Sequence, residues 1–361
     1  MSSGKSHLPF ILLNLILLFL VVFLSIHIEL KWDSRDVEKN NWILAEGGDL
    51  VQHHFRGLYR YDPYLGWVPQ DNVAVEKWGQ MVHTQEDGVR SNGLQAETGG
   101  KPCILVLGDS FTFGDEVGDD QTWPAQLEST TGYQVINAGV SSYGLDQMLL
   151  RAQELVEKYD PEILIVGFIY ETLERSSQSV RHGVPKPYFV IQNNQLVLRN
   201  TPVPLKKNVR LDWFREVFGK SFFIHQIMSR LFPRYWWKDT IRDIRFIFND
   251  RMEVNRRLID RFEELAGDHR ELIFLVLAGY NVEEEHEVKI GSLLSRVFSH
   301  ADKKNVYVFN LIPAFLHLKQ QNPENFFLLH NMSFRDPHLS PLGNQFVASE
   351  VKRLIQTRLV F

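Results

Sequence analysis

The stretch that decides the fold is Cys103-Ile104-Leu105-Val106-Leu107, followed at once by Gly108-Asp109-Ser110. A continuous apolar run of this kind is typical of a β-strand that is buried on both faces of a parallel sheet. A strand that ends in Gly-Asp-Ser leaves the serine at the carboxyl edge of the sheet, where open α/β sheets bind their ligands. The segment therefore predicts an α/β fold with Ser110 as a candidate nucleophile, although a Gly-Asp-Ser tripeptide taken alone is more often a turn.

Strands and helices alternate along the chain from residue 101 onward. The predicted strands are 103–107, 134–138, 162–168, 272–277 and 305–310, and the predicted helices are 121–131, 145–158, 253–266, 287–300 and 341–358. This alternation predicts a parallel sheet covered by helices on both faces. The interval 176–250 interrupts it. There, 188–198 is predicted to be a β-hairpin with an Asn-Asn turn, and an aromatic and basic stretch around 222–245 follows. We interpret this interval as an insertion that packs on the domain, lies over the active site or lies against a membrane surface.

Composition excludes several classes of function. The net charge of −5 argues against a nucleic-acid partner. The single cysteine, Cys103, excludes an intrachain disulfide and is interpreted as a small core residue of the buried strand. No Cys/His cluster has the spacing of a zinc site, so the sequence implies neither a metal nor an organic cofactor.

The amino terminus differs from the rest of the chain. Residues Leu8 to Ile28 carry no formal charge and are long enough to cross a bilayer as a helix. Lys5 precedes this segment and favours a cytoplasmic amino terminus. No small-x-small cleavage motif follows, which favours an uncleaved signal anchor over a removed signal peptide. We therefore expect three parts. Residues 1–30 form a cytoplasmic tail and a single transmembrane helix, 31–100 form a turn-rich lead-in, and 101–361 form the main domain, in the periplasm or outside the cell.

Two further segments supply a base and a candidate oxyanion site. Asp336 and His338 stand two residues apart, so in an extended loop both side chains point the same way. Asp336 would then orient His338, which takes the proton of Ser110; the alternative is that both residues cap the helix that follows. Gly139 follows the second predicted strand and offers a backbone N–H to an oxyanion, together with the N–H of Ser110. The alternative for Gly139 is a strand-to-helix turn.

Together and in this order, these segments resemble the SGNH/GDSL hydrolase superfamily. The serine block is Gly108-Asp109-Ser110-Phe111, the glycine block is Asn137-Ala138-Gly139, and the acid-base block is Asp336-Pro337-His338. The resemblance implies a flavodoxin-like three-layer α/β/α sandwich, with Ser110 as the nucleophile of an ester-cleaving or acyl-transferring enzyme.

The chain departs from the family pattern in two places. The acid-base block has Asp-x-His where many members have Asp-x-x-His. In the third block, Glu171 stands where the family has an asparagine whose amide donates to the oxyanion. An ionised glutamate cannot donate a hydrogen bond. Either Glu171 is held protonated, or another donor such as Thr172 substitutes, or catalysis is impaired.

Three functions remain open on the sequence. The leading hypothesis is a membrane-anchored serine hydrolase that removes O-acyl groups from an envelope or exported carbohydrate or lipid. A close variant is a polysaccharide O-acetyltransferase with the same acyl-serine intermediate. The third is a non-catalytic envelope protein that keeps the fold and binds a glycan or a partner. The sequence does not identify protein partners.

Overall fold

The computed structural model describes residues 12–14, 16–20, 57–93, 100–181, 184–204, 211–238, 251–280, 291, 294–295, 298, 304–332 and 337–358. The chain divides into two compact units. The smaller comprises Met1–His54, His182–Val184 and Lys206–Arg245, and the larger comprises Phe55–Arg181, Pro185–Leu205 and Phe246–Phe361.

A five-stranded parallel sheet forms the centre of the larger unit. Its strands are β5 (Cys103–Gly108), β6 (Gln134–Asn137), β7 (Ile163–Phe168), β12 (Glu271–Val276) and β13 (Val306–Asn310). Their order across the sheet is β13-β12-β7-β5-β6, and each neighbouring pair is parallel. Taken in chain order this is the 2-1-3-4-5 arrangement of flavodoxin-like sheets. The five predicted strands and the α/β class are confirmed, and each residue of β5 and β7 is buried as the apolar runs predict.

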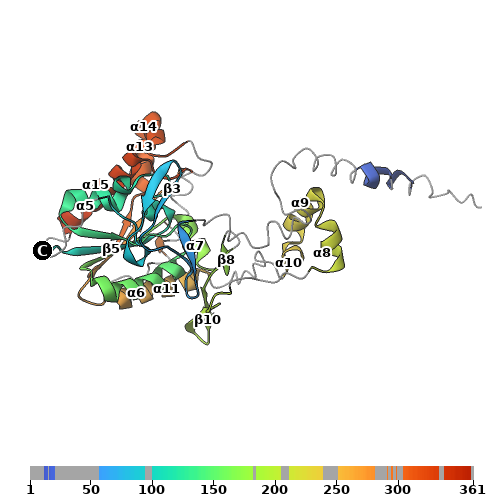
Figure 1. Cartoon of the computed structure of the whole chain (residues 1–361), viewed down its shortest axis with the longest axis horizontal. Coiled ribbons are helices and arrows are strands. Elements are labelled where there is room, and N and C mark those ends of the chain that lie inside the picture. Colours follow the sequence, from blue (N-terminus) through green and yellow to red (C-terminus); the bar gives the residue numbers. More distant parts are fainter. Residues whose placement is uncertain are drawn as a thin grey trace, which may run out of the picture. The chain divides into compact units, whose positions relative to one another are not determined.

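Helices cover both faces of this sheet (Figure 1). The helices α5 (Trp123–Thr131) and α15 (Pro341–Arg358) pack together on one face, and α6 (Leu145–Tyr159) and α11 (Arg251–Ala266) pack together on the other. Local sequence sets the ends of α5: the hydroxyl of Thr122 accepts the N–H of Ala125, and Gly132 ends the helix in the left-handed conformation. Four of the five predicted helices are thus confirmed; the fifth, 287–300, lies mostly outside the described residues.

The described residues of this unit also form shorter helices. Among them are α7 (Tyr170–Arg175), which follows β7, and α13 (Ile312–Gln321) and α14 (Pro323–Leu328), which follow β13. Among the described residues between α14 and α15, an isolated antiparallel bridge pairs His330 with Leu339.

The described part of the lead-in consists of two antiparallel hairpins. The first pairs β1 (Tyr59–Asp62) with β2 (Gly66–Pro69), and the second pairs β3 (Ala74–Lys77) with β4 (Gln80–His83). After the second hairpin and the short η1 helix (Glu86–Gly88), the backbone N–H of Arg90 donates to the carbonyl of Asn137, 2.8 Å away, at the end of β6. The lead-in therefore reaches the sheet beside the carboxyl ends of its strands.

The interval after α7 contains the predicted hairpin. The strands β10 (Tyr188–Gln192) and β11 (Gln195–Arg199) pair in antiparallel register around Asn193 and Asn194, both of which have positive φ angles, of 50° and 61°. Two consecutive residues with positive φ are the mark of a type I′ turn, in which asparagine is favoured. A short ladder of β8 (Val180–Arg181) and β9 (Val184–Pro185) precedes the hairpin. The helices α8 (Trp213–Phe218), α9 (Phe222–Leu231) and α10 (Pro233–Trp236) belong to the smaller unit.

Most of the apolar segment at the amino terminus lies outside the described residues. Its described residues, 12–14 and 16–20, are helical. Within the described ranges, no helix combines the length and the apolar character that a membrane span requires.

Candidate active site

Ser110 is the first residue of a one-turn helix, α4 (Ser110–Phe113), which begins directly after β5. Gly108 makes this tight turn possible, because a Cβ atom there would lie 2.1 Å from Oγ1 of Thr112. Asp109 caps the helix, since its Oδ1 accepts the N–H of Phe111 at 3.0 Å. Ser110 is therefore fixed at the carboxyl edge of the sheet, where the sequence predicts it.

Asp109 also ties the serine turn to the neighbouring strand. Its second oxygen, Oδ2, accepts the hydroxyl of Thr172 at 2.7 Å and Nη1 of Arg175 at 3.2 Å. Both donors lie on α7, which follows β7, and β5 and β7 are the pair between which the strand order of the sheet reverses. Ser110 therefore stands at the topological switch point, where ligands bind in sheets of this kind.

His338 is the partner of Ser110. Its Nε2 lies 2.8 Å from Oγ of Ser110, although the two residues are 228 positions apart in the chain. The backbone carbonyl of His338 accepts the N–H of Asn331 at 2.9 Å, which holds the histidine loop against the segment that follows α14. The predicted pairing of this serine with this histidine is present in the structure.

The other side of the imidazole faces Glu116. Nδ1 of His338 lies 2.8 Å from Oε1 of Glu116, and the backbone N–H of His338 donates to Oε2 of the same carboxylate at 3.1 Å. The Glu116 side chain is 4% exposed and that of His338 is 19% exposed. A carboxylate at Nδ1 keeps the proton on that nitrogen and leaves Nε2 free to accept the serine proton.

The charges around His338 raise the pKa of the imidazole. Burial alone would lower it, but the hydrogen bond to Glu116 and the negative charges of Asp115, Glu116 and Asp109 outweigh burial. The imidazolium that forms when His338 takes a proton is thus stabilised where it is needed. In return, the neutral imidazole that can accept a proton becomes populated at a higher pH than in an ordinary histidine.

Asp115 joins the site to the lead-in. Its Oδ1 accepts the hydroxyl of Ser141 at 2.6 Å, and the phenol of Tyr59 in turn donates to Oγ of Ser141 at 2.8 Å. Burial raises the pKa of Asp115, while the nearby His338 and Lys77 oppose this shift. Tyr59 belongs to β1, so a residue of the lead-in takes part in the polar network of Asp115, whose charge acts on His338.

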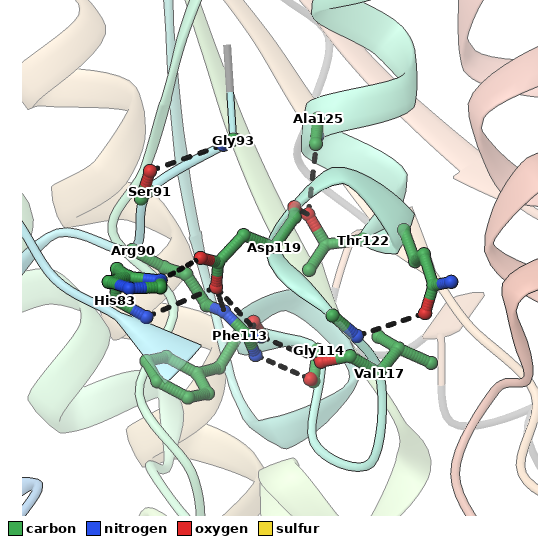
Figure 2. A network of polar contacts seen from close by, with 12 residues as sticks. His83, Arg90, Ser91, Gly93, Phe113, Gly114, Val117, Asp119, Thr122 and Ala125 are labelled. Atoms are coloured by element: carbon green, nitrogen blue, oxygen red, sulfur yellow. Dashed lines mark hydrogen bonds and ion pairs between the residues drawn. The ribbon is translucent and has the colours of Figure 1, made fainter. Parts of the chain in front are cut away.

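The loop that carries Glu116 is clamped by Arg90, another residue of the lead-in (Figure 2). The guanidinium donates to the carbonyls of Phe113, Gly114 and Val117 at 3.0, 2.5 and 2.7 Å, and it is paired with Asp119 at 3.2 Å. Arg90 is 1% exposed. A planar guanidinium can serve several carbonyls at once, which a lysine ammonium at the same place cannot match.

This clamp offsets an unfavourable backbone conformation. Glu116 has φ of +74°, in the left-handed region that favours glycine. A non-glycine residue held in a sparsely populated conformation costs about 1–3 kcal/mol and persists only where its surroundings over-determine it. Arg90 binds carbonyls on both sides of Glu116, and the carbonyl of Glu116 accepts Nδ2 of Asn331 at 3.1 Å.

The residues expected to bind an oxyanion are placed less favourably. The N–H of Gly139 already donates to Oδ1 of Asn137 at 3.2 Å. A Cβ at Gly139 would lie 2.5 Å from the backbone nitrogen of Phe113, so close packing against α4 by itself requires a glycine there. Glu171 is exposed in the first turn of α7, and the Thr172 hydroxyl is engaged by Asp109. An oxyanion role for Ser110 and Gly139 stays a prediction, and it requires the Gly139 N–H to leave Asn137 when substrate binds.

Asp336, the predicted partner of His338, lies outside the described residues. At Nδ1 of His338, where the sequence predicts Asp336, the structure places the carboxylate of Glu116. Sequence reasoning missed Glu116, Asp115 and Arg90. The available signal was the acidic pair Asp115-Glu116, which stands between Gly114 and the buried Val117, a few residues after the serine block. Within the described ranges, no cluster of histidine, cysteine and acidic side chains is arranged to hold a metal ion.

Comparisons with known proteins gave structural likeness only. No family model matches the chain, and no curated protein matches it. Similar solved structures include a lipolytic protein of the G-D-S-L family from Desulfitobacterium hafniense DCB-2, 17% identical with a TM-score of 0.40, which covers 70% of this chain and 99% of that one. They also include the lipase/acylhydrolase from Enterococcus faecalis, which is 12% identical with a TM-score of 0.40 and covers 71% of this chain and 96% of that one. The acetyl xylan esterase AlAXEase is 14% identical with a TM-score of 0.39 and covers 70% of this chain and 99% of that one. At these TM-scores the function has to be inferred from the residues of the site.

Proposed function

We propose that the chain is a serine hydrolase of the SGNH/GDSL type that cleaves O-acyl esters through an acyl-serine intermediate. One observation carries this proposal: Ser110, His338 and Glu116 form a continuous relay, with 2.8 Å between serine and imidazole and 2.8 Å between imidazole and carboxylate. A serine hydroxyl is a weak nucleophile unless a base accepts its proton, and a base works best when a third group orients it. A protein that only binds a ligand has no need of this geometry.

The reaction follows from the positions of these atoms. Nε2 of His338 accepts the proton of Ser110 as Oγ bonds to the acyl carbon, and Glu116 stabilises the imidazolium. When the tetrahedral intermediate collapses, the bond to the alcohol oxygen breaks and that oxygen takes the proton from His338. Water then attacks the acyl-serine, gives its proton to His338 and releases the carboxylic acid, and the proton returns to Ser110.

The substrate that we propose is an O-acylated carbohydrate or lipid of the cell envelope or of exported material. This rests on the predicted signal anchor, which would hold the chain in a membrane by a single helix with the hydrolase domain on the periplasmic or outer side. An O-acetyltransferase would use the same relay, with a sugar hydroxyl in place of water.

Fluorophosphonate labelling of the full chain in detergent tests the proposal. We expect labelling at Ser110, located by mass spectrometry of the peptide, and its loss in Ser110→Ala and His338→Ala. Ser129→Ala, at an exposed serine of α5, is the matched control and should label like the parent. A folded parent that reacts neither with this probe nor with the smaller phenylmethylsulfonyl fluoride, and that does not hydrolyse p-nitrophenyl acetate, would contradict catalysis. The binding alternative would then take its place.

A further inference from the structure

The helices α8, α9 and α10 have a small apolar core of their own. Trp236 is fully buried and Trp237 nearly so. The side chains that pack against this pair are Leu211, Phe214, Phe218, Ile224 and Met228. The apolar residues of 211–238 that lie outside this core therefore need another explanation.

A second set of large apolar side chains in this segment is exposed. On α9, Phe223, Ile227 and Leu231 are 46%, 39% and 68% exposed, and their spacing of four residues places them on one side of the helix. On α8, Trp213 and Val217 are 71% and 44% exposed with the same spacing. Exposed aromatic residues also follow α9, namely Phe232 (56%) and Tyr235 (39%). We call these seven residues the apolar face of the α8–α10 segment.

The same segment is basic. Residues 211–238 contain Arg215, Lys220, Arg230, Arg234 and Lys238 against Asp212 and Glu216, which is five positive and two negative charges, or +3, in a chain whose net charge is −5. Arg215 is buried and paired with Asp212, but the other four basic residues are exposed. A surface that combines aromatic and aliphatic side chains with lysine and arginine is typical of helices that lie in the interface of an anionic membrane.

Two further observations favour a lipid surface as the occupant. The segment belongs to the same unit of the structure as the apolar amino-terminal segment, which the sequence predicts to be a membrane anchor. The longest of its helices, α9, has 10 residues, about 15 Å at the rise of an α-helix, which is half of what a span requires. It is therefore suited to lie on a bilayer but not to cross one.

We propose that the apolar face of α8–α10 inserts into the headgroup region of an anionic bilayer (the yellow helices of Figure 1). Phe223, Ile227 and Leu231 enter the boundary of the acyl chains, and Lys220, Arg230 and Arg234 bind lipid phosphates. This contact is additional to the predicted anchor and does not depend on the hydrolase activity.

Site-specific fluorescence on the full chain tests this proposal. The chain carries Ile227→Cys labelled with the dye NBD and is reconstituted into vesicles of phosphatidylcholine with one quarter phosphatidylglycerol. The native Cys103 does not interfere, because it is buried and burial raises the pKa of its thiol to about 12. The matched control is Ser349→Cys, at an exposed position of α15 in the larger unit. Hydrolysis of p-nitrophenyl acetate by both variants should equal that of the parent.

We expect NBD at position 227 to shift to the blue and to be quenched several-fold more strongly by nitroxide-labelled lipids than NBD at position 349. Replacing Lys220, Arg230 and Arg234 together by glutamate should reduce that quenching in anionic vesicles. Equal access of iodide to positions 227 and 349 in vesicles would overturn the proposal. A second outcome would also overturn the proposal. If position 227 is protected from iodide but is not quenched by lipid nitroxides, and the particles hold two copies of the chain, a second copy covers the apolar face.

Discussion

Nδ1 of His338 lies 2.8 Å from Oε1 of Glu116, a residue 222 positions earlier in the chain. The same carboxylate accepts the backbone N–H of His338, so one side chain fixes both the ring and the backbone of the proposed base. In this arrangement the serine loop supplies the nucleophile at Ser110 and, six residues later, the acid of the relay. The histidine loop then has to supply only the base.

Glu116→Gln should lower kcat by about 10³–10⁴-fold, because an amide no longer stabilises the imidazolium and can hold the wrong tautomer of His338. The measurement is hydrolysis of a soluble ester, with the fold checked by thermal unfolding. The matched variant is Asp336→Asn, whose kcat should stay close to that of the parent. The opposite ranking, with Asp336→Asn the more damaging change, would assign the acid of the relay to Asp336.

The pH dependence of kcat/KM reports on His338. The pKa of its imidazole is raised above 6.5 against the effect of burial, chiefly by the hydrogen bond with Glu116, and only the neutral ring accepts a proton from Ser110. Activity should therefore fall on the acid side at a pH above 6.5, and Glu116→Gln should move this limb to lower pH. By linkage, the raised pKa of His338 stabilises the folded state. This stabilisation is complete at a pH below the pKa that the residue has in the unfolded chain, and it is lost as pH rises through the pKa in the folded state. An acid limb that stays in place in Glu116→Gln would mean that another group sets it.

Arg90 should affect both stability and catalysis, although it does not touch Ser110 or His338 in the described contacts. Arg90→Met leaves three loop carbonyls and Asp119 without the guanidinium, and we expect a loss of about 2–5 kcal/mol in the free energy of unfolding. Arg90→Lys keeps the charge but not the fork of donors, so it should fold while kcat falls and KM changes little. The two quantities are measured by urea unfolding and by ester hydrolysis. A folded Arg90→Lys with the kcat of the parent would show that the clamp serves only the fold.

The pKa of His330 is shifted in the opposite direction from that of His338. Burial lowers the pKa of His330 to about 4, among the rings of Tyr280, Phe315 and Phe326. Because the pKa is 6.5 in the unfolded chain and about 4 in the folded state, the free energy of unfolding is highest above pH 6.5 and decreases as pH falls toward 4. The decrease amounts to about 3 kcal/mol. His330→Phe should remove this dependence of the free energy of unfolding on pH, as urea titrations at several pH values would measure. A variant that keeps the parent's dependence between pH 4 and 6.5 would place its origin elsewhere.

Much of the fold was predictable because its signals are local. The apolar runs 103–107 and 162–168 identify strands that are buried on both faces, and the alternation of strands with amphipathic helices predicts the parallel sheet. Asn193-Asn194 predicts the hairpin at 188–198, because asparagine adopts the positive φ angles that the turn requires.

The site was predictable only in part. Ser110 and His338 follow recognisable local motifs, and the structure brings them together. The oxyanion group was harder to infer. A glycine such as Gly139 is compatible both with a free N–H and with close packing. The sequence does not show that the Gly139 N–H donates to the side chain of Asn137, or that Phe113 packs too close for a Cβ atom at position 139.

The sequence by itself determined the five strands of the sheet, four of the helices that cover it and the position of Ser110 at its carboxyl edge, because backbone conformation and burial follow from short-range patterns of apolar and turn-forming residues. Only the tertiary structure decided that Glu116 faces His338 and that Arg90 of the lead-in clamps the loop that carries Glu116. Those contacts join segments that are far apart in the chain. They depend on which loops meet at the edge of the sheet, and the local periodicity of the sequence does not predict which loops these are.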